Sequence, residues 1–158
     1  MLSEKDREMI DLLVEQEARL EELYRAFGGR FPKSGSFWEE MAAEERLHGS
    51  WLGKLRQAAE AEVVAFDSGK IRRAAVHTFL GFIGQCLEEA RGQRVNELRS
   101  FHLARDLEAA LLEQRVFEHF SGDSAKFRSV SDRVRGATEI HRERLERELA
   151  RREAEMPE

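Results

Sequence analysis

Apolar residues recur every three or four positions along most of the chain, and this spacing constrains the fold more than any other sequence feature. Ile10, Leu13, Leu20, Tyr24 and Phe27 form one such series. This spacing places their side chains on a single face of a helix. Similar series occupy three further segments, and only 2 Pro occur in 158 residues to interrupt them. The sequence therefore predicts an all-α fold built from long amphipathic helices.

Capping signals divide the chain into four long helices and one longer connection. Ser3 with Asp6, and Ser36 with Glu39, resemble the capping boxes that open helices. We expect helices over about residues 4–27, 37–60, 95–120 and 124–152. The segment of about 61–94 is expected to be a crossover with a buried helical part, all within a single domain, 1–158. Four antiparallel helices with one long crossover are typical of the ferritin-like bundle.

The charge balance and the hydrophobic content exclude two classes of protein. The chain has 26 Lys and Arg against 31 Asp and Glu, a formal net charge of −5. This balance excludes a strongly basic nucleic-acid-binding protein. Hydrophobic residues make up 41% of the chain, with 10 Phe and 2 Trp. That content supplies a core, so the chain is not expected to be disordered.

The cysteine count and the lengths of the apolar runs exclude thiol-based sites and a membrane-spanning segment. Cys86 is the single cysteine, so the chain has neither an internal disulfide nor a CxxC pair. No apolar run approaches the roughly 20 residues that cross a bilayer. We therefore expect a cytoplasmic protein without a membrane segment.

Each predicted apolar stripe is interrupted near its middle by a residue that does not belong in a hydrophobic core. Glu17 interrupts the first stripe, Glu45 and His48 the second, Glu113 the third and His141 the fourth. Buried carboxylates without a partner are costly, so their convergence calls for a compensating cation. Carboxylate oxygen and imidazole nitrogen suit iron, manganese or zinc. The sequence therefore predicts a metal site inside the bundle.

The two halves of the chain repeat this pattern. Glu17 is followed seven residues later by Tyr24, as Glu113 is by Phe120. Bundles with a dinuclear site take one Glu from each of two helices and Glu-x-x-His from each of the other two. The repeat therefore predicts two helical hairpins that face each other across the site.

With these motifs the chain resembles the rubrerythrin branch of the ferritin-like superfamily, over about residues 5–150. The resemblance lies in the segments EARLEELY, MAAEERLH and LLEQRVFEHF. It implies a non-haem di-iron carboxylate centre, in a homodimer, that reacts with peroxide or dioxygen. The implied roles are one iron on Glu17 and His48, the other on Glu113 and His141, a bridging Glu45, and Tyr24 beside the centre.

Two departures from the family pattern affect these expectations. The second Glu-x-x-His has Thr138 in place of Glu, so one bridging carboxylate is missing and one iron is possible instead of two. Thr138 is in a position to hydrogen-bond a metal-bound water or oxidant. The rubredoxin-like module of full-length rubrerythrins needs paired CxxC motifs. With a single cysteine, the electrons would come from a separate donor protein.

Two functions of different classes remain open. The first is a rubrerythrin-like oxidoreductase that reduces peroxide or dioxygen, or handles iron, with manganese or zinc as other possible metals. The second is a degenerate, metal-poor helical-bundle dimer that acts as a binding or structural protein. Metal content separates the two.

Overall fold

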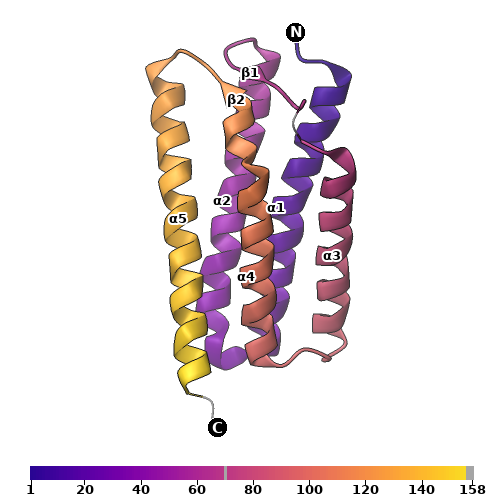
Figure 1. The fold of residues 1–158 in the computed structure, drawn as a ribbon, viewed down its shortest axis with the longest axis vertical. Coiled ribbons are helices and arrows are strands. Elements are labelled where there is room, and N and C mark those ends of the chain that lie inside the picture. The colour runs from indigo at the N-terminus through magenta and orange to yellow at the C-terminus, as the bar shows by residue number, and fades with distance from the viewer. Residues whose placement is uncertain (70, 156–158) are drawn as a thin grey trace.

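The computed structural model describes residues 1–69 and 71–155. These residues form five α-helices, two short 3-10 helices and two two-residue strands (Figure 1). The α-helices are α1 (Glu4–Arg30), α2 (Gly35–Glu60), α3 (Arg73–Arg91), α4 (Glu97–Gln114) and α5 (Ala125–Ala154). The all-α class predicted from the sequence is confirmed. None of the described helices is long and apolar enough to cross a membrane.

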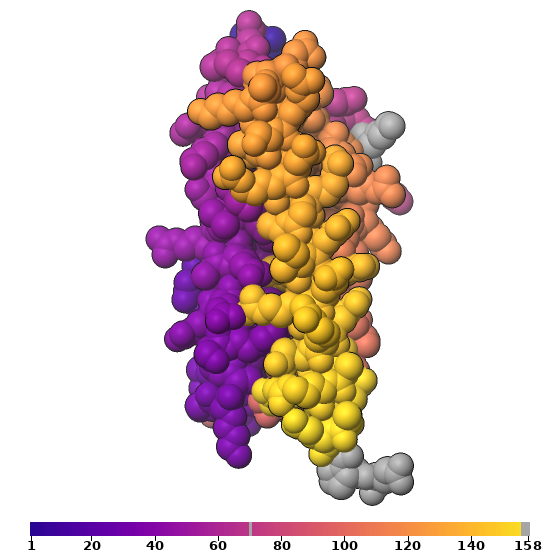
Figure 2. Space-filling view, turned by 90° about the vertical axis from the view of Figure 1, so that its left-hand side faces the viewer, coloured from indigo at the N-terminus to yellow at the C-terminus, as the bar shows by residue number. Residues whose placement is uncertain are grey.

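The five helices lie side by side along the long axis of the molecule (Figure 1). α1 and α2 run in opposite directions and pack against each other, and α3 packs on α1. α4 and α5 form a second antiparallel pair. Figure 2 shows α5 along the length of the molecule, with α2 on one side and α4 on the other. The predicted crossover thus contains a helix, α3, in which Cys86 is buried.

The first predicted helix cap is correct and the second is not. Ser3 caps α1, because its side-chain oxygen accepts a hydrogen bond from the backbone N–H of Asp6 at 3.0 Å. α2 instead begins at Gly35, directly after the 3-10 helix η1 (Pro32–Ser34). Ser36 therefore lies inside the helix rather than at its cap. Proline at the start of η1 fixes the turn that joins the two helices.

The hydrophobic core consists of two clusters at different heights in the bundle. The Trp38 cluster includes Tyr24, Phe27, Trp38, Phe101 and Leu145. The Leu13 cluster includes Ile10, Leu13, Leu52, Val76 and Phe120. On α1, Glu17 lies between Leu13 of one cluster and Leu20 of the other. The polar residues of the stripes therefore lie between two apolar layers.

α4 ends earlier than the sequence predicts. The predicted helix runs to residue 120, whereas α4 stops at Gln114 and Arg115 adopts a left-handed conformation with φ 48° and ψ 45°. The 3-10 helix η2 (Val116–His119) and strand β2 (Phe120–Ser121) follow. β2 pairs antiparallel with β1 (Ala65–Phe66), and the rings of Phe66 and Phe120 lie 4.6 Å apart. Burial of Phe120 in this pair takes the chain out of the helix.

The left-handed turn predicts an unusual order of stability at position 115. A side chain with a Cβ costs about 1–2 kcal/mol in this conformation, and a β-branched one costs more. We expect Arg115→Val to unfold at lower urea concentration than Arg115→Gly. At Arg133, an exposed position within α5, the order should reverse because glycine is the poorer helix former. The same order at both positions would contradict the turn.

Candidate metal centre

Four helices bring five buried polar residues together between the two apolar clusters. α1 supplies Glu17, α2 supplies Glu45 and His48, α4 supplies Glu108, and α5 supplies His141. Each is at most 5% exposed, and Glu45 is fully buried. We refer to these five residues as the candidate centre.

The candidate centre consists of two overlapping groups that share Glu45. One group is Glu17, Glu45 and His48, and the other is Glu45, Glu108 and His141. Within each group, one ligand atom per residue lies within 4.8 Å of the others. One oxygen of Glu45 is 3.5 Å from Nδ1 of His48, and the other is 3.4 Å from Nε2 of His141. The two oxygens of Glu45 thus serve different groups, as those of a bridging ligand do.

The outer ligands complete each group. Nδ1 of His48 lies 3.9 Å from Oε2 of Glu17, and Nε2 of His141 lies 3.2 Å from Oε1 of Glu108. Glu45 and His48 are three residues apart on α2, which places them one above the other on the same face. The centroids of the two imidazole rings are 5.9 Å apart. The two histidines therefore lie on either side of Glu45.

The prediction that Glu113 faces the interior is wrong. Glu113 is exposed on α4 and is absent from both groups; Glu108 occupies the inward position. The assumed repeat needed a continuous helix from Glu113 to Phe120, and the helix ends between them. The sequence does contain a series that predicts an inward-facing Glu108. Its members are spaced by three, four and three residues, and they are Phe101, Ala104, Glu108 and Leu111.

Tyr24 and Thr138 both lie close to the candidate centre. Tyr24 is fully buried and its hydroxyl donates a hydrogen bond to Oε1 of Glu108 at 2.5 Å. Thr138 is partly buried one turn before His141, and its hydroxyl donates to the backbone carbonyl of Val134 at 2.9 Å. Tyr24 therefore orients a candidate ligand, whereas the Thr138 hydroxyl is engaged within its own helix.

A charged residue of α2 also contacts the ring nitrogen of His141 that faces away from Glu45, and an arginine of α5 pairs with that residue. Its Nδ1 contacts a carboxylate oxygen of Glu44. Arg144, one turn further along α5, contacts the other oxygen of Glu44 at 3.0 Å and also pairs with Glu40. Ring orientation set by a carboxylate on the far nitrogen is common for metal-binding histidines. This arrangement directs Nε2 of His141 towards Glu45 and Glu108.

Burial and mutual repulsion shift the protonation of the metal-free cluster. Burial raises the pKa of Glu17 well above its ordinary value, and the charge of Glu45 adds to this effect. Burial, followed by the charge of Glu108, raises the pKa of Glu45 to about 8. Burial also disfavours ionised Glu108, but His141 and Tyr24 outweigh it and lower its pKa. Protons are therefore shared unequally among the three carboxyl groups.

His141 acts as the internal cation of the metal-free cluster. Burial by itself would lower its pKa, but Glu108, Glu44 and Glu45 together raise that pKa to about 11. The imidazolium partly offsets the carboxylates around it. Its positive charge occupies the place that a metal ion would take between Glu45 and Glu108.

The hydrogen-bond inventory of the candidate centre is incomplete. Both oxygens of Glu45, Oε2 of Glu17 and Nε2 of His141 are buried without a hydrogen-bond partner. Leaving such a buried group unsatisfied costs about 1–3 kcal/mol. These atoms belong to the two groups defined above. A set of three carboxylates and two imidazoles, in which Glu17, Glu45 and His141 have unsatisfied buried atoms, fits divalent iron, manganese or zinc.

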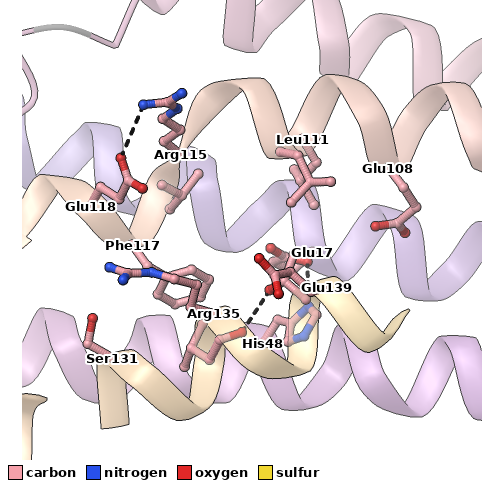
Figure 3. Close-up of a pocket in the computed structure, with 14 residues that line it drawn as sticks. Glu17, His48, Glu108, Leu111, Arg115, Phe117, Glu118, Ser131, Arg135 and Glu139 are labelled. Carbon is pink, nitrogen blue, oxygen red and sulfur yellow. Dashed lines mark hydrogen bonds and ion pairs between the residues drawn. The ribbon is translucent and has the colours of Figure 1, made fainter. Parts of the chain in front are cut away.

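A cavity of about 330 Å³ opens beside the candidate centre. Glu17, His48 and Glu108 lie at one end of it, and Arg115, Glu118 and Ser131 lie towards the other (Figure 3). Thr138 and Glu139 also line this cavity. The cavity therefore connects the candidate ligands with the charged surface around the end of α4.

Comparisons with protein-family models, curated proteins and solved structures return no match. The resemblance to rubrerythrins thus rests on the motifs in the sequence.

Glu17→Gln is expected to stabilise the metal-free protein. Because the folded-state pKa of Glu17 is raised, its ionisation opposes folding, and this cost grows as the pH rises above the unfolded-state value. With a chelator present, the variant should gain about 1 kcal/mol or more in unfolding free energy at pH 7, and little at pH 4.

Urea denaturation at both pH values measures this gain. Glu15→Gln, an exposed change on the same helix, serves as the control and should shift stability by less than about 0.5 kcal/mol. No gain for Glu17→Gln at pH 7 would show that the buried carboxylate is already compensated within the metal-free protein.

Proposed function

We propose that this chain is a rubrerythrin-like, ferritin-like protein that holds two iron ions and reduces peroxide or dioxygen, or handles iron. The observation that carries the proposal is Glu45, whose two oxygens face two separate Glu and His pairs. In this proposal Glu17 and His48 hold one ion, Glu108 and His141 hold the other, and Glu45 bridges them. When bound, two ferrous ions supply the electrons that reduce the oxidant.

The arrangement of the helices supports the same proposal. α1, α2, α4 and α5 each contribute to the candidate centre, while α3 lies on the connection between α2 and α4 and packs on α1. Four ligand-bearing helices with a long crossover between the second and third match the ferritin-like pattern. The Glu-x-x-His of that pattern is complete on α2 and lacks its Glu at Thr138 on α5.

The protein's own residues have defined tasks in this proposal. Tyr24 holds the Glu108 carboxylate through its hydroxyl, and the Glu44 and Arg144 pair fixes the ring of His141. The apolar clusters cover the layer of ligands from above and below, while the cavity reaches it from the side. Following the resemblance, the protein acts as a cytoplasmic homodimer. It takes electrons from a separate donor protein, because its single cysteine provides no rubredoxin-like site.

Iron stoichiometry after anaerobic loading with Fe(II) tests the proposal. We expect about two irons per chain, and loss of both in the Glu45→Ala, His48→Ala double variant. Glu108→Gln should weaken binding of the second ion, whereas Glu113→Gln, an exposed change on the same helix, should leave the stoichiometry unchanged. A rapid optical change on adding peroxide would then support redox turnover.

Other stoichiometries lead to different conclusions. One iron per chain would indicate a mononuclear relative, and binding no stronger than in the double variant would overturn the redox proposal. Equal losses in Glu108→Gln and Glu113→Gln would contradict the assignment of Glu108.

Metal loading is expected to release protons at pH 7. His141 has a pKa of about 11 and Glu45 one of about 8, so both hold a proton at pH 7 that a metal must displace. Because the pKa of Glu17 is also raised, we expect at least two protons released on complete loading in weak buffer, and tighter apparent binding as the pH rises. A pH indicator in the titration measures the release, and the double variant provides the blank. Loading without proton release would contradict the proposed ligands.

The second candidate function is a metal-poor helical-bundle dimer that acts as a binding or structural protein. Protonated His141 favours it, because an imidazolium between Glu44, Glu45 and Glu108 partly neutralises the cluster without a metal. Replacement of a bridging Glu by Thr138 points the same way. The absence of metal binding in the loading experiment would support this function.

A further inference from the structure

The cavity beside the candidate centre is larger than a small oxidant needs. Its volume of about 330 Å³ lies within the range of sites for small organic molecules. A water molecule occupies only about 30 Å³ in the liquid, and dioxygen and peroxide are not much larger. Dioxygen or peroxide would therefore fill only a small part of this cavity.

The walls of the cavity are mainly apolar. The apolar part of the lining comes from α4, η2 and α5 and comprises Leu111, Leu112, Val116, Phe117 and Val134. Polar and charged residues complete the lining. The early end of α4 creates this space, because the left-handed turn at Arg115 moves Val116 and Phe117 off the line of the helix. Thr138 also lines this side of the cavity, and its side chain is shorter than the Glu of the rubrerythrin pattern. An apolar wall of this kind suits an aliphatic or aromatic group.

The charges at the two ends of the cavity differ. The inner end holds Glu17, His48 and Glu108. At the outer end, Arg115 pairs with Glu118 at 3.8 Å, and Arg135 has no ion pair among the described residues although Glu139 also lines the cavity. An anionic group placed inward would face two carboxylates, whereas placed outward it would meet the guanidinium of Arg135.

We propose that this cavity binds a small organic acid with an apolar body, its carboxylate at Arg135 and its apolar end towards the candidate centre. A medium-chain aliphatic carboxylate is the simplest member of this class. Its binding depends only on the cavity, while its role as a substrate or ligand of the centre rests on the proposed function. Under the proposed function, the apolar end of the bound acid would then lie next to the residues that would hold the metal ions.

Calorimetric titration with octanoate tests the proposal on the full chain, both metal-free and loaded with iron under anaerobic conditions. We expect binding in both forms. Arg135→Gln should weaken it about tenfold, since a charge-assisted hydrogen bond is worth about 1.5–3 kcal/mol. Arg133→Gln, exposed two residues away on α5, is the matched control and should bind as the unmodified chain does.

A second pair of variants tests the apolar wall. Leu111→Trp fills the cavity and should reduce octanoate binding at least tenfold, while iron stoichiometry and helix content by circular dichroism stay unchanged. Leu47→Trp adds the same side chain at a position 47% exposed on α2 and should have no effect. Octanol, which lacks the anionic group, should bind about tenfold more weakly than octanoate.

The outcomes separate this inference from the proposed function. Iron binding without octanoate binding overturns the inference and leaves the proposed function standing. Octanoate binding to a chain that takes up no iron supports the proposed ligand site and overturns the proposed iron centre. Octanoate binding that ignores both Arg135→Gln and Leu111→Trp places the ligand elsewhere and overturns the inference. Binding only to the iron-loaded form, unaffected by Arg135→Gln, reverses the proposed orientation and overturns it as well.

Discussion

The structure depends on the burial of three carboxyl groups and two imidazoles in one layer of the bundle. Glu45 lies at the centre of this layer, fully buried and with neither oxygen hydrogen-bonded. An apolar residue at this position would avoid that desolvation cost. Burial of apolar residues in the clusters above and below offsets this desolvation cost. Buried polar groups that lower the stability of a folded core in this way are typical of a functional site.

The surroundings of the candidate centre hold its geometry from several helices. Tyr24 connects α1 to Glu108 of α4, and Glu44 connects α2 to His141 of α5. Gln16 and Gln114 exchange hydrogen bonds at 2.9 and 3.1 Å, which joins α1 to the end of α4. Each helix that carries a candidate ligand is thus tied to another through a polar contact. Such contacts position the inward atoms before any ion arrives.

Four of the five residues of the candidate centre could be predicted from the sequence, and the reason is regular helical geometry. Glu17, Glu45, His48 and His141 each continue an apolar series at steps of three or four through the middle of an unbroken helix. The period of the helix fixes their direction once those helices form. The apolar residues of the crossover also predicted a helix there, but α3 is amphipathic rather than mostly buried, since Val76, Phe79 and Ile83 are buried while Phe82 is exposed.

Glu108 was missed because the end of α4 depends on tertiary contacts. Arg115 carries no glycine or proline signal, yet its left-handed conformation ends the helix. What favours this turn is the pairing of Phe120 with Phe66, which lies 54 residues earlier in the chain. A local reading therefore extended the helix and selected Glu113 by its spacing to Phe120. Helix ends that depend on contacts between distant segments cannot be predicted from the local spacing of residues.

The departures from the rubrerythrin pattern lie on one side of the candidate centre. Where the pattern has a Glu on α5 this chain has Thr138, and α4 ends at the turn at Arg115. Both residues line the same cavity. A site losing its function would be expected to lose its most costly residues first, since neutral replacements of Glu17 or Glu45 relieve the desolvation of a buried charge. In this chain Glu17 and Glu45 are present, and the cavity is lined by Thr138, which is shorter than the Glu of the rubrerythrin pattern. Under the proposed function, this combination favours a centre that admits a larger molecule over a centre that has lost its activity.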